Sequence, residues 1–114
     1  MQINDMVKEA YDNAVAHGWH DQERSFGELI ALCHSELSEA LEDYRHGYKP
    51  TDVYYTRRNY DDDNKPCGIP SELADVVIRI ADMCGQYGID LDKAVTEKTA
   101  YNKTRSYRHN GKTI

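Results

Sequence analysis

The stretch PSELADVVIRIADMCGQY, residues 70–87, decides the fold. Pro70 favours the start of a helix and Gly88 its end. Between them, apolar residues cover about two-thirds of the helix circumference: Leu73, Ala74, Val76, Val77, Ile78, Ile80, Ala81, Met83 and Cys84. The remaining narrow stripe holds only Glu72, Asp75, Arg79 and Asp82. A helix that is apolar on most sides is typically buried, so we expect its polar stripe to face something specific.

A second predicted helix carries a matching acidic stripe. It begins at the capping box 25–28 and ends near His46. Glu36, Glu39 and Asp43 lie at i, i+3 and i+7, on one shoulder of its apolar arc. If the two helices pack antiparallel, the pair Glu36/Glu39 converges with the pair Glu72/Asp75. All-oxygen ligation of that kind suits Mg²⁺ or Mn²⁺.

Each acidic pair taken alone is more typical of a solvated helix surface. Two such pairs are harder to explain in that way, because one of them interrupts an otherwise apolar helix. For Arg79 and Asp82, an ion pair between them, or between Asp75 and Arg79, is an alternative to a ligand role.

The rest of the chain predicts two further helices, over residues 3–17 and 91–103, and no strand. Residues 48–68 break every periodicity and are read as a long loop or flap. The basic tail, 106–114, is expected to be extended. The prediction is one all-α, four-helix-bundle-like domain over residues 1–114. Its thin core favours completion by homo-oligomerisation.

Composition narrows the classes of function. The chain has 114 residues, a net charge of −6 and a mean hydropathy of −0.82. Residues 1–96 carry nine Lys/Arg against nineteen Asp/Glu, which disfavours binding to nucleic acid. No apolar run approaches the ~20 residues of a membrane span, and the N-terminus lacks a signal peptide. Three cysteines without a CxxC pair fit a reducing cytoplasm.

The last predicted helix places Lys98, Asn102 and Arg105 at i, i+4 and i+7, in line with its apolar seam. By residue type, Lys and Arg beside a metal site are phosphate ligands. A solvated helix end, where the helix dipole favours basic residues, explains them equally well.

Three segments together resemble the MazG-like branch of the all-α NTP pyrophosphatases. They are ELSEAL (36–41), SELADVVIRIADMCGQYGIDLDKAV (71–95) and EKTAYNKTR (97–105). The resemblance implies Mg²⁺-dependent, or Mn²⁺-dependent, hydrolysis of a nucleoside triphosphate to a monophosphate and pyrophosphate. It also implies a homodimer or homotetramer.

Carried over by position, the resemblance implies that Glu36, Glu39, Glu72 and Asp75 are the metal ligands. Other roles follow from the same comparison. Glu39 and Lys98 would be catalytic, and substrate would contact Trp19, His20, Lys98, Asn102 and Arg105. Trp19 is the only tryptophan, and an apolar plug at the end of the bundle is the alternative interpretation of this residue.

Two alternatives stand beside this interpretation. Within the same superfamily, the enzyme would accept a narrower range of substrates: dUTP, dCTP or a phosphoribosyl-nucleotide. In a different class, the chain is a non-catalytic helical dimer whose acidic stripes form ion pairs at an interface.

Overall fold

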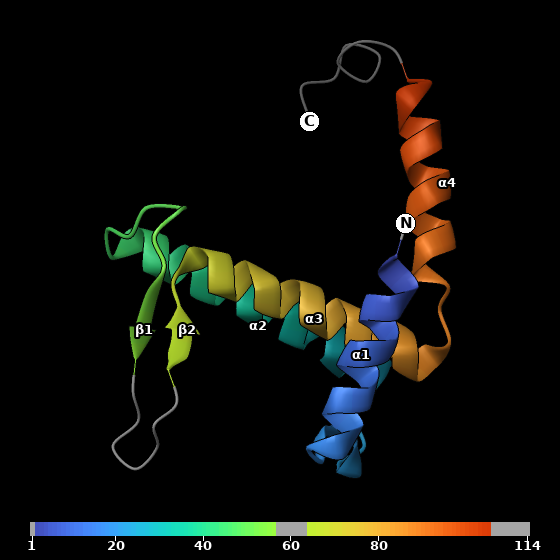
Figure 1. Ribbon diagram of the computed structural model, residues 1–114, viewed down its shortest axis with the longest axis horizontal. Helices are drawn as coiled ribbons and strands as arrows, with labels where there is room; N and C mark the ends of the chain where they lie inside the picture. Colours follow the sequence, from blue (N-terminus) through green and yellow to red (C-terminus); the bar gives the residue numbers. More distant parts are fainter. Residues whose placement is uncertain (1, 57–63, 106–114) are drawn as a thin grey trace.

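The computed structural model describes residues 2–56 and 64–105, which are predominantly helical (Figure 1). The elements run in the order α1 (Ile3–Ala16), η1 (Trp19–Asp21), α2 (Phe26–Arg45), β1 (Tyr54–Thr56), β2 (Lys65–Cys67), α3 (Ile69–Tyr87) and α4 (Leu91–Lys103). The helical class predicted from the sequence is confirmed. No helix in these two ranges has the length and apolar character needed to cross a membrane.

Local capping chemistry sets the helix ends close to where the sequence predicts them. The Ser25 side chain accepts a hydrogen bond from the backbone N–H of Glu28, and Asp90 accepts one from that of Lys93, both at 3.1 Å. Gly88 closes α3 in the left-handed region, at φ 66°. The short-range signals therefore fix where three of the helices begin or end.

The prediction of no strand is wrong for the segment between α2 and α3. Tyr54–Thr56 and Lys65–Cys67 pair as a short antiparallel hairpin, with Tyr54 opposite Cys67. Tyr and Thr favour strands, but three residues are too few for an alternating pattern to stand out. The central part of the expected flap, 57–63, and the expected extended tail, 106–114, lie outside the described residues.

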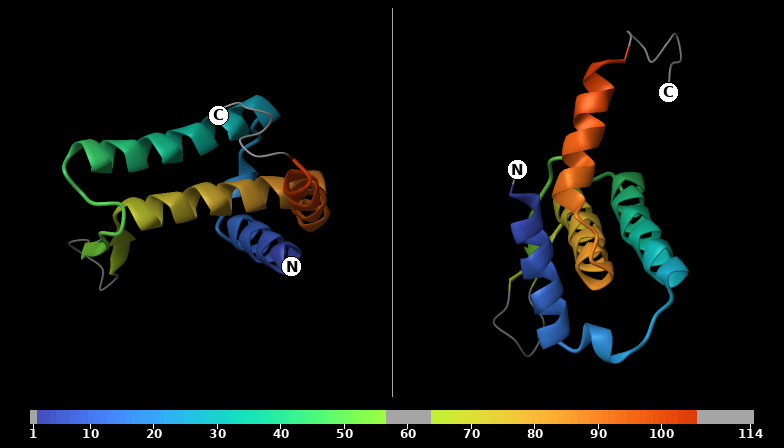
Figure 2. Two further views of the ribbon diagram at one scale, coloured as in Figure 1. Left: turned by 90° about the horizontal axis from the view of Figure 1, so that it is seen from above. Right: turned by 90° about the vertical axis from the view of Figure 1, so that its right-hand side faces the viewer.

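The helices do not form a closed bundle within one chain. α2 and α3 run antiparallel side by side, and α1 crosses the other side of α3 (Figures 1 and 2). α4 turns away from this pair. Its beginning is tied to α1 through Asn4, whose side chain donates to Asp90 and accepts from the backbone N–H of Asp92. The C-terminal half of α4 projects away from α2 and α3 (Figure 1).

The core is small. The sequence predicts that α3 is buried, but part of its apolar surface is exposed. Val7, Ala81 and Cys84 form the buried cluster where α1 meets α3. On the remaining surface of α3, Leu73 and Val77 stay 46% and 45% exposed. The prediction fails because α1 and α2 each cover one side of α3, while α4 leaves instead of covering a third.

A close approach of α1 to α3 depends on Gly85. A β-carbon added there would lie 2.5 Å from Tyr11 Cβ. We therefore expect Gly85→Ala to push the helices apart and to lower the free energy of unfolding by about 1–3 kcal/mol. Gly27→Ala is the control, because its added methyl would meet nothing closer than 3.9 Å. Thermal denaturation of both variants checks this, and equal melting temperatures would show that the contact does not limit packing.

Candidate metal centre and adjoining cavity

Three of the four predicted metal ligands lie together between α2 and α3. Glu36 and Glu39 are one turn apart on the same side of α2, and Glu72 lies in the first turn of α3. One carboxylate oxygen from each of the three lies within 4.8 Å of the others. The antiparallel pairing produces this cluster, because it sets the start of α3 beside the C-terminal half of α2.

The fourth predicted ligand, Asp75, is not part of this three-carboxylate group. It lies one turn further along α3, within electrostatic reach of the group. Partial burial raises the pKa of Asp75, the charge of Glu36 raises it further, and Arg79 offsets part of the effect. Asp75 therefore borders the cluster.

Glu72 is the member of the cluster under the greatest electrostatic strain. Its Oε2 is buried and has no hydrogen-bond partner in the described part of the chain. Burial, the neighbouring Glu39 and the charge of Asp75 raise the pKa of Glu72 to about 7. A bound divalent cation would satisfy this oxygen and relieve the repulsion. The donor set, all carboxylate oxygens, therefore fits Mg²⁺ or Mn²⁺.

Arg79 joins the cluster to the chain's only tryptophan. Its Nε donates a 2.7 Å hydrogen bond to Glu36 Oε1. Its guanidinium carbon lies 4.6 Å from the ring centre of Trp19, and that of Arg24 lies 3.8 Å from the same ring. Arg79 thus pairs across to α2 and not with Asp75, a choice that spacing along α3 does not reveal.

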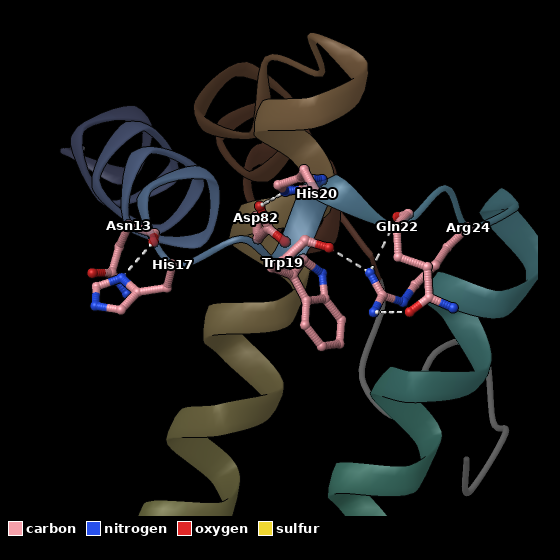
Figure 3. A network of polar contacts seen from close by, with 7 residues as sticks. All are labelled: Asn13, His17, Trp19, His20, Gln22, Arg24 and Asp82. Atoms are coloured by element: carbon pink, nitrogen blue, oxygen red, sulfur yellow. Dashed lines mark hydrogen bonds and ion pairs between the residues drawn. The ribbon is translucent and has the colours of Figure 1, made fainter.

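A second polar pair holds η1 against α3 (Figure 3). His20 Nε2 donates to Asp82 Oδ1 at 2.7 Å, and the His20 ring also contacts Tyr11, with ring centres 5.1 Å apart. Asp82 is the one charged residue among those described that is classed as buried, at 7% exposure. The two partners are 62 positions apart, so no motif in the sequence pairs them.

A cavity of about 300 Å³ lies between α1, η1, α2 and α3, beside the carboxylate cluster. Small apolar residues of α1 and Ile78 form part of its wall. Its remaining lining residues are Asn13, Trp19, Glu36, Asp75, Arg79 and Asp82. The polar stripe of α3 that the sequence singles out therefore does face something specific: its last three members border this cavity.

The predicted ligands on α4 are not brought to the carboxylates within one chain. Lys98, on α4, and Arg105, two residues beyond its end, lie near the ring of Tyr101, at 5.4 and 5.9 Å from its centre. Asn102 belongs to the exposed C-terminal half of α4. Of the predicted substrate-binding residues, Trp19 borders the cavity, whereas His20 does not line it and is hydrogen-bonded to Asp82, which does.

The raised pKa of Glu72 predicts a pH-dependent stability in the absence of metal. A carboxyl group with a folded-state pKa of about 7 and an ordinary value of 4.5 stabilises the fold below pH 4.5. That contribution is lost as the pH rises through 7. In EDTA at pH 8, we expect Glu72→Gln to raise the free energy of unfolding by about 1–3 kcal/mol and so to raise the melting temperature. At pH 4.5 we expect no such gain.

Glu9→Gln, on the exposed side of α1, is the control for this comparison. It should shift the melting temperature equally at both pH values. A Glu72→Gln shift that is also independent of pH would mean that Glu72 titrates normally.

Comparisons with protein-family models, with curated proteins and with solved structures found no match for this chain. The site is therefore interpreted from its own geometry. That geometry consists of a three-carboxylate cluster with an unsatisfied buried oxygen, an adjoining cavity with an aromatic ring, and a polar stripe that runs from one to the other.

Proposed function

We propose that this chain is a Mg²⁺-dependent nucleoside triphosphate pyrophosphohydrolase. It would convert a ribo- or deoxyribonucleoside triphosphate and water into the monophosphate and pyrophosphate, and so clear unwanted nucleotides from the pool. The observation that carries the proposal is the unsatisfied Oε2 of Glu72 inside a three-carboxylate cluster, next to a cavity bordered by Trp19. The resemblance to MazG-like enzymes points in the same direction.

Each part of the site has a role in this proposal. Glu36, Glu39 and Glu72, bordered by Asp75, would hold Mg²⁺, with Mn²⁺ as a substitute. The metal, when bound, supplies charge neutralisation for the phosphates and a water of lowered pKa. Glu39 is the most exposed of the three, so its carboxylate is suited to orient the attacking water. Trp19 offers its ring to a base, and base–aromatic contacts contribute about 1–3 kcal/mol.

We also propose that the functional unit is a homodimer or a tetramer built from dimers. An apolar groove of about 410 Å³ lies between α2 and α3, on the surface that α4 leaves uncovered. Ile30, Leu37 and Met83 are among its lining residues, and Leu41 is 58% exposed one turn beyond Leu37. A monomer would leave this surface in water, whereas a second copy would bury it. Lys98 and Asn102 would then reach the phosphates only across such an interface.

The enzymatic proposal is tested by pyrophosphate release from all common NTPs and dNTPs, with Mg²⁺ or Mn²⁺. Glu39→Gln should lose at least 100-fold in turnover, on the order of a removed catalytic charge. The fold should be retained, because the side-chain volume is unchanged. Glu42→Gln is the matched control: it lies one turn further on α2 and pairs with Arg45, outside the cluster.

Two results would contradict this proposal. One is full activity in Glu39→Gln at saturating Mg²⁺. The other is an unsubstituted chain that neither releases pyrophosphate nor is stabilised by either metal, which would favour the non-catalytic helical dimer.

The oligomeric proposal is tested by sedimentation at micromolar concentration. Leu41→Glu should shift the chain from dimer or tetramer towards monomer, because it buries a charge in the expected interface. Val15→Glu is the control: Val15 is 47% exposed, but on α1, away from the α2–α3 groove. A monomeric unsubstituted chain, or dissociation by both substitutions alike, would refute this interface.

A further inference from the structure

Asp82 is a buried carboxylate that the metal cluster does not use. It lies two helical turns beyond Asp75 on α3, about 10 Å along the helix axis. Burying a charge is costly unless the charge is paired and hydrogen-bonded. His20 supplies one such bond, at 2.7 Å to Oδ1, and the side chains of both partners are largely buried, at 18% and 10% exposure. This pair therefore fixes both the position and the orientation of the carboxylate.

The other oxygen of Asp82, Oδ2, is not used by the pair with His20. No described residue donates a hydrogen bond to Oδ2, but this oxygen is not fully buried. Since Asp82 lines the cavity beside Asn13 and Trp19, Oδ2 is available to a ligand there. The cavity thus has a metal-binding end, at Glu36 and Asp75, and a hydrogen-bond acceptor at its other end.

The chemistry of a carboxylate restricts what binds beside it. An ionised Asp only accepts hydrogen bonds, and it accepts best from two adjacent N–H groups. Among the common bases, guanine alone presents such a pair on its Watson–Crick edge, a ring N–H next to an exocyclic amino group. Adenine and cytosine place one amino donor beside an acceptor nitrogen, and uracil places one N–H between two carbonyl oxygens.

We infer that Asp82, oriented by His20, is a specificity-determining residue that selects a guanine base in the cavity. This inference deepens the proposed function and rests on it: the phosphates lie at the carboxylate cluster and the base edge lies at Asp82. Trp19 lies beside the base, and the Asn13 amide has a donor for the guanine carbonyl oxygen. The rival explanation is a purely structural pair that pins η1 to α3.

Uncharged nucleosides test the base site separately from metal and catalysis. Guanosine, inosine and adenosine are titrated in EDTA, with the fluorescence of Trp19, the only tryptophan, as the signal. The unsubstituted chain should bind guanosine about 10-fold more tightly than adenosine, within the range expected for one bidentate pair. Inosine keeps the ring N–H but lacks the amino group, and it should fall between the two.

Asp82→Asn keeps the shape of the side chain but replaces one acceptor with a donor. It should weaken guanosine binding about 10-fold and leave adenosine binding unchanged, so that the preference disappears. Asp21→Asn, on the exposed side of η1, is the matched control and should keep the preference. A structural pair predicts instead that Asp82→Asn lowers the affinity for all three nucleosides together, and that result would overturn the inference.

Two substitutions of His20 test the same inference if Asp82→Asn does not fold. His20→Gln retains a side-chain N–H that can reach Asp82, and should keep part of the preference for guanosine. His20→Phe removes the donor and should lose it. Circular dichroism melting curves confirm that each variant is folded before it is titrated.

The two proposals fail in different ways. Equal binding of the three nucleosides by the unsubstituted chain, or no binding of guanosine, overturns the selection of guanine, whatever the hydrolysis assay shows. A preference for guanosine without pyrophosphate release under any metal condition overturns the proposed hydrolysis and leaves a guanine-binding site.

Discussion

The carboxylate of Glu72, enclosed between α2 and α3, is the constraint on which the rest of the site depends. Its Oε2 is buried without a hydrogen-bond donor, and burial together with Glu39 raises the pKa of the group to about 7. An apolar residue at this position would pack between the two helices at no such cost. The helix pair thus keeps an electrostatically unfavourable carboxylate between α2 and the first turn of α3, as expected of a site that binds a cation.

Much of the scaffold follows from short-range signals, and the site follows only in part. Capping by Ser25 and Asp90, and the left-handed Gly88, predict helix ends because each acts within one turn. Helical spacing likewise groups Glu36 with Glu39. The pairs Arg79–Glu36 and His20–Asp82 cannot be predicted in this way, because they join different elements through the packing of α1 and α2 on α3. The hairpin escapes prediction because three-residue strands carry too little pattern.

The course of α4 explains why two features stay exposed within one chain: the side chains predicted to bind substrate and part of the apolar surface of α3. α4 is tied to the start of α1 by Asn4 and Asp90, and this contact directs it away from the α2–α3 pair. The apolar side of α3 around Val77 stays exposed for the same reason, and so do Lys98 and Asn102. One cause, the direction of α4, thus accounts for both features, and a second copy of the chain is the simplest structure that would resolve both.

The four residues of the polar stripe of α3 make different contacts in order along the helix. Glu72 and Asp75, nearest the N-terminus of the helix, border the candidate cation position. Arg79, one turn on, pairs with Glu36 and lies against Trp19, and so connects the cluster to the wall of the cavity. Asp82, a further turn on, is held in place by His20. Because an α-helix keeps these positions on one side at fixed intervals, a ligand bound at one end of the stripe is held at a set distance from the other. In the proposed enzyme, this rigid spacing would let the base determine where the phosphates lie relative to the metal, and selection of the base would then act directly on the rate of hydrolysis.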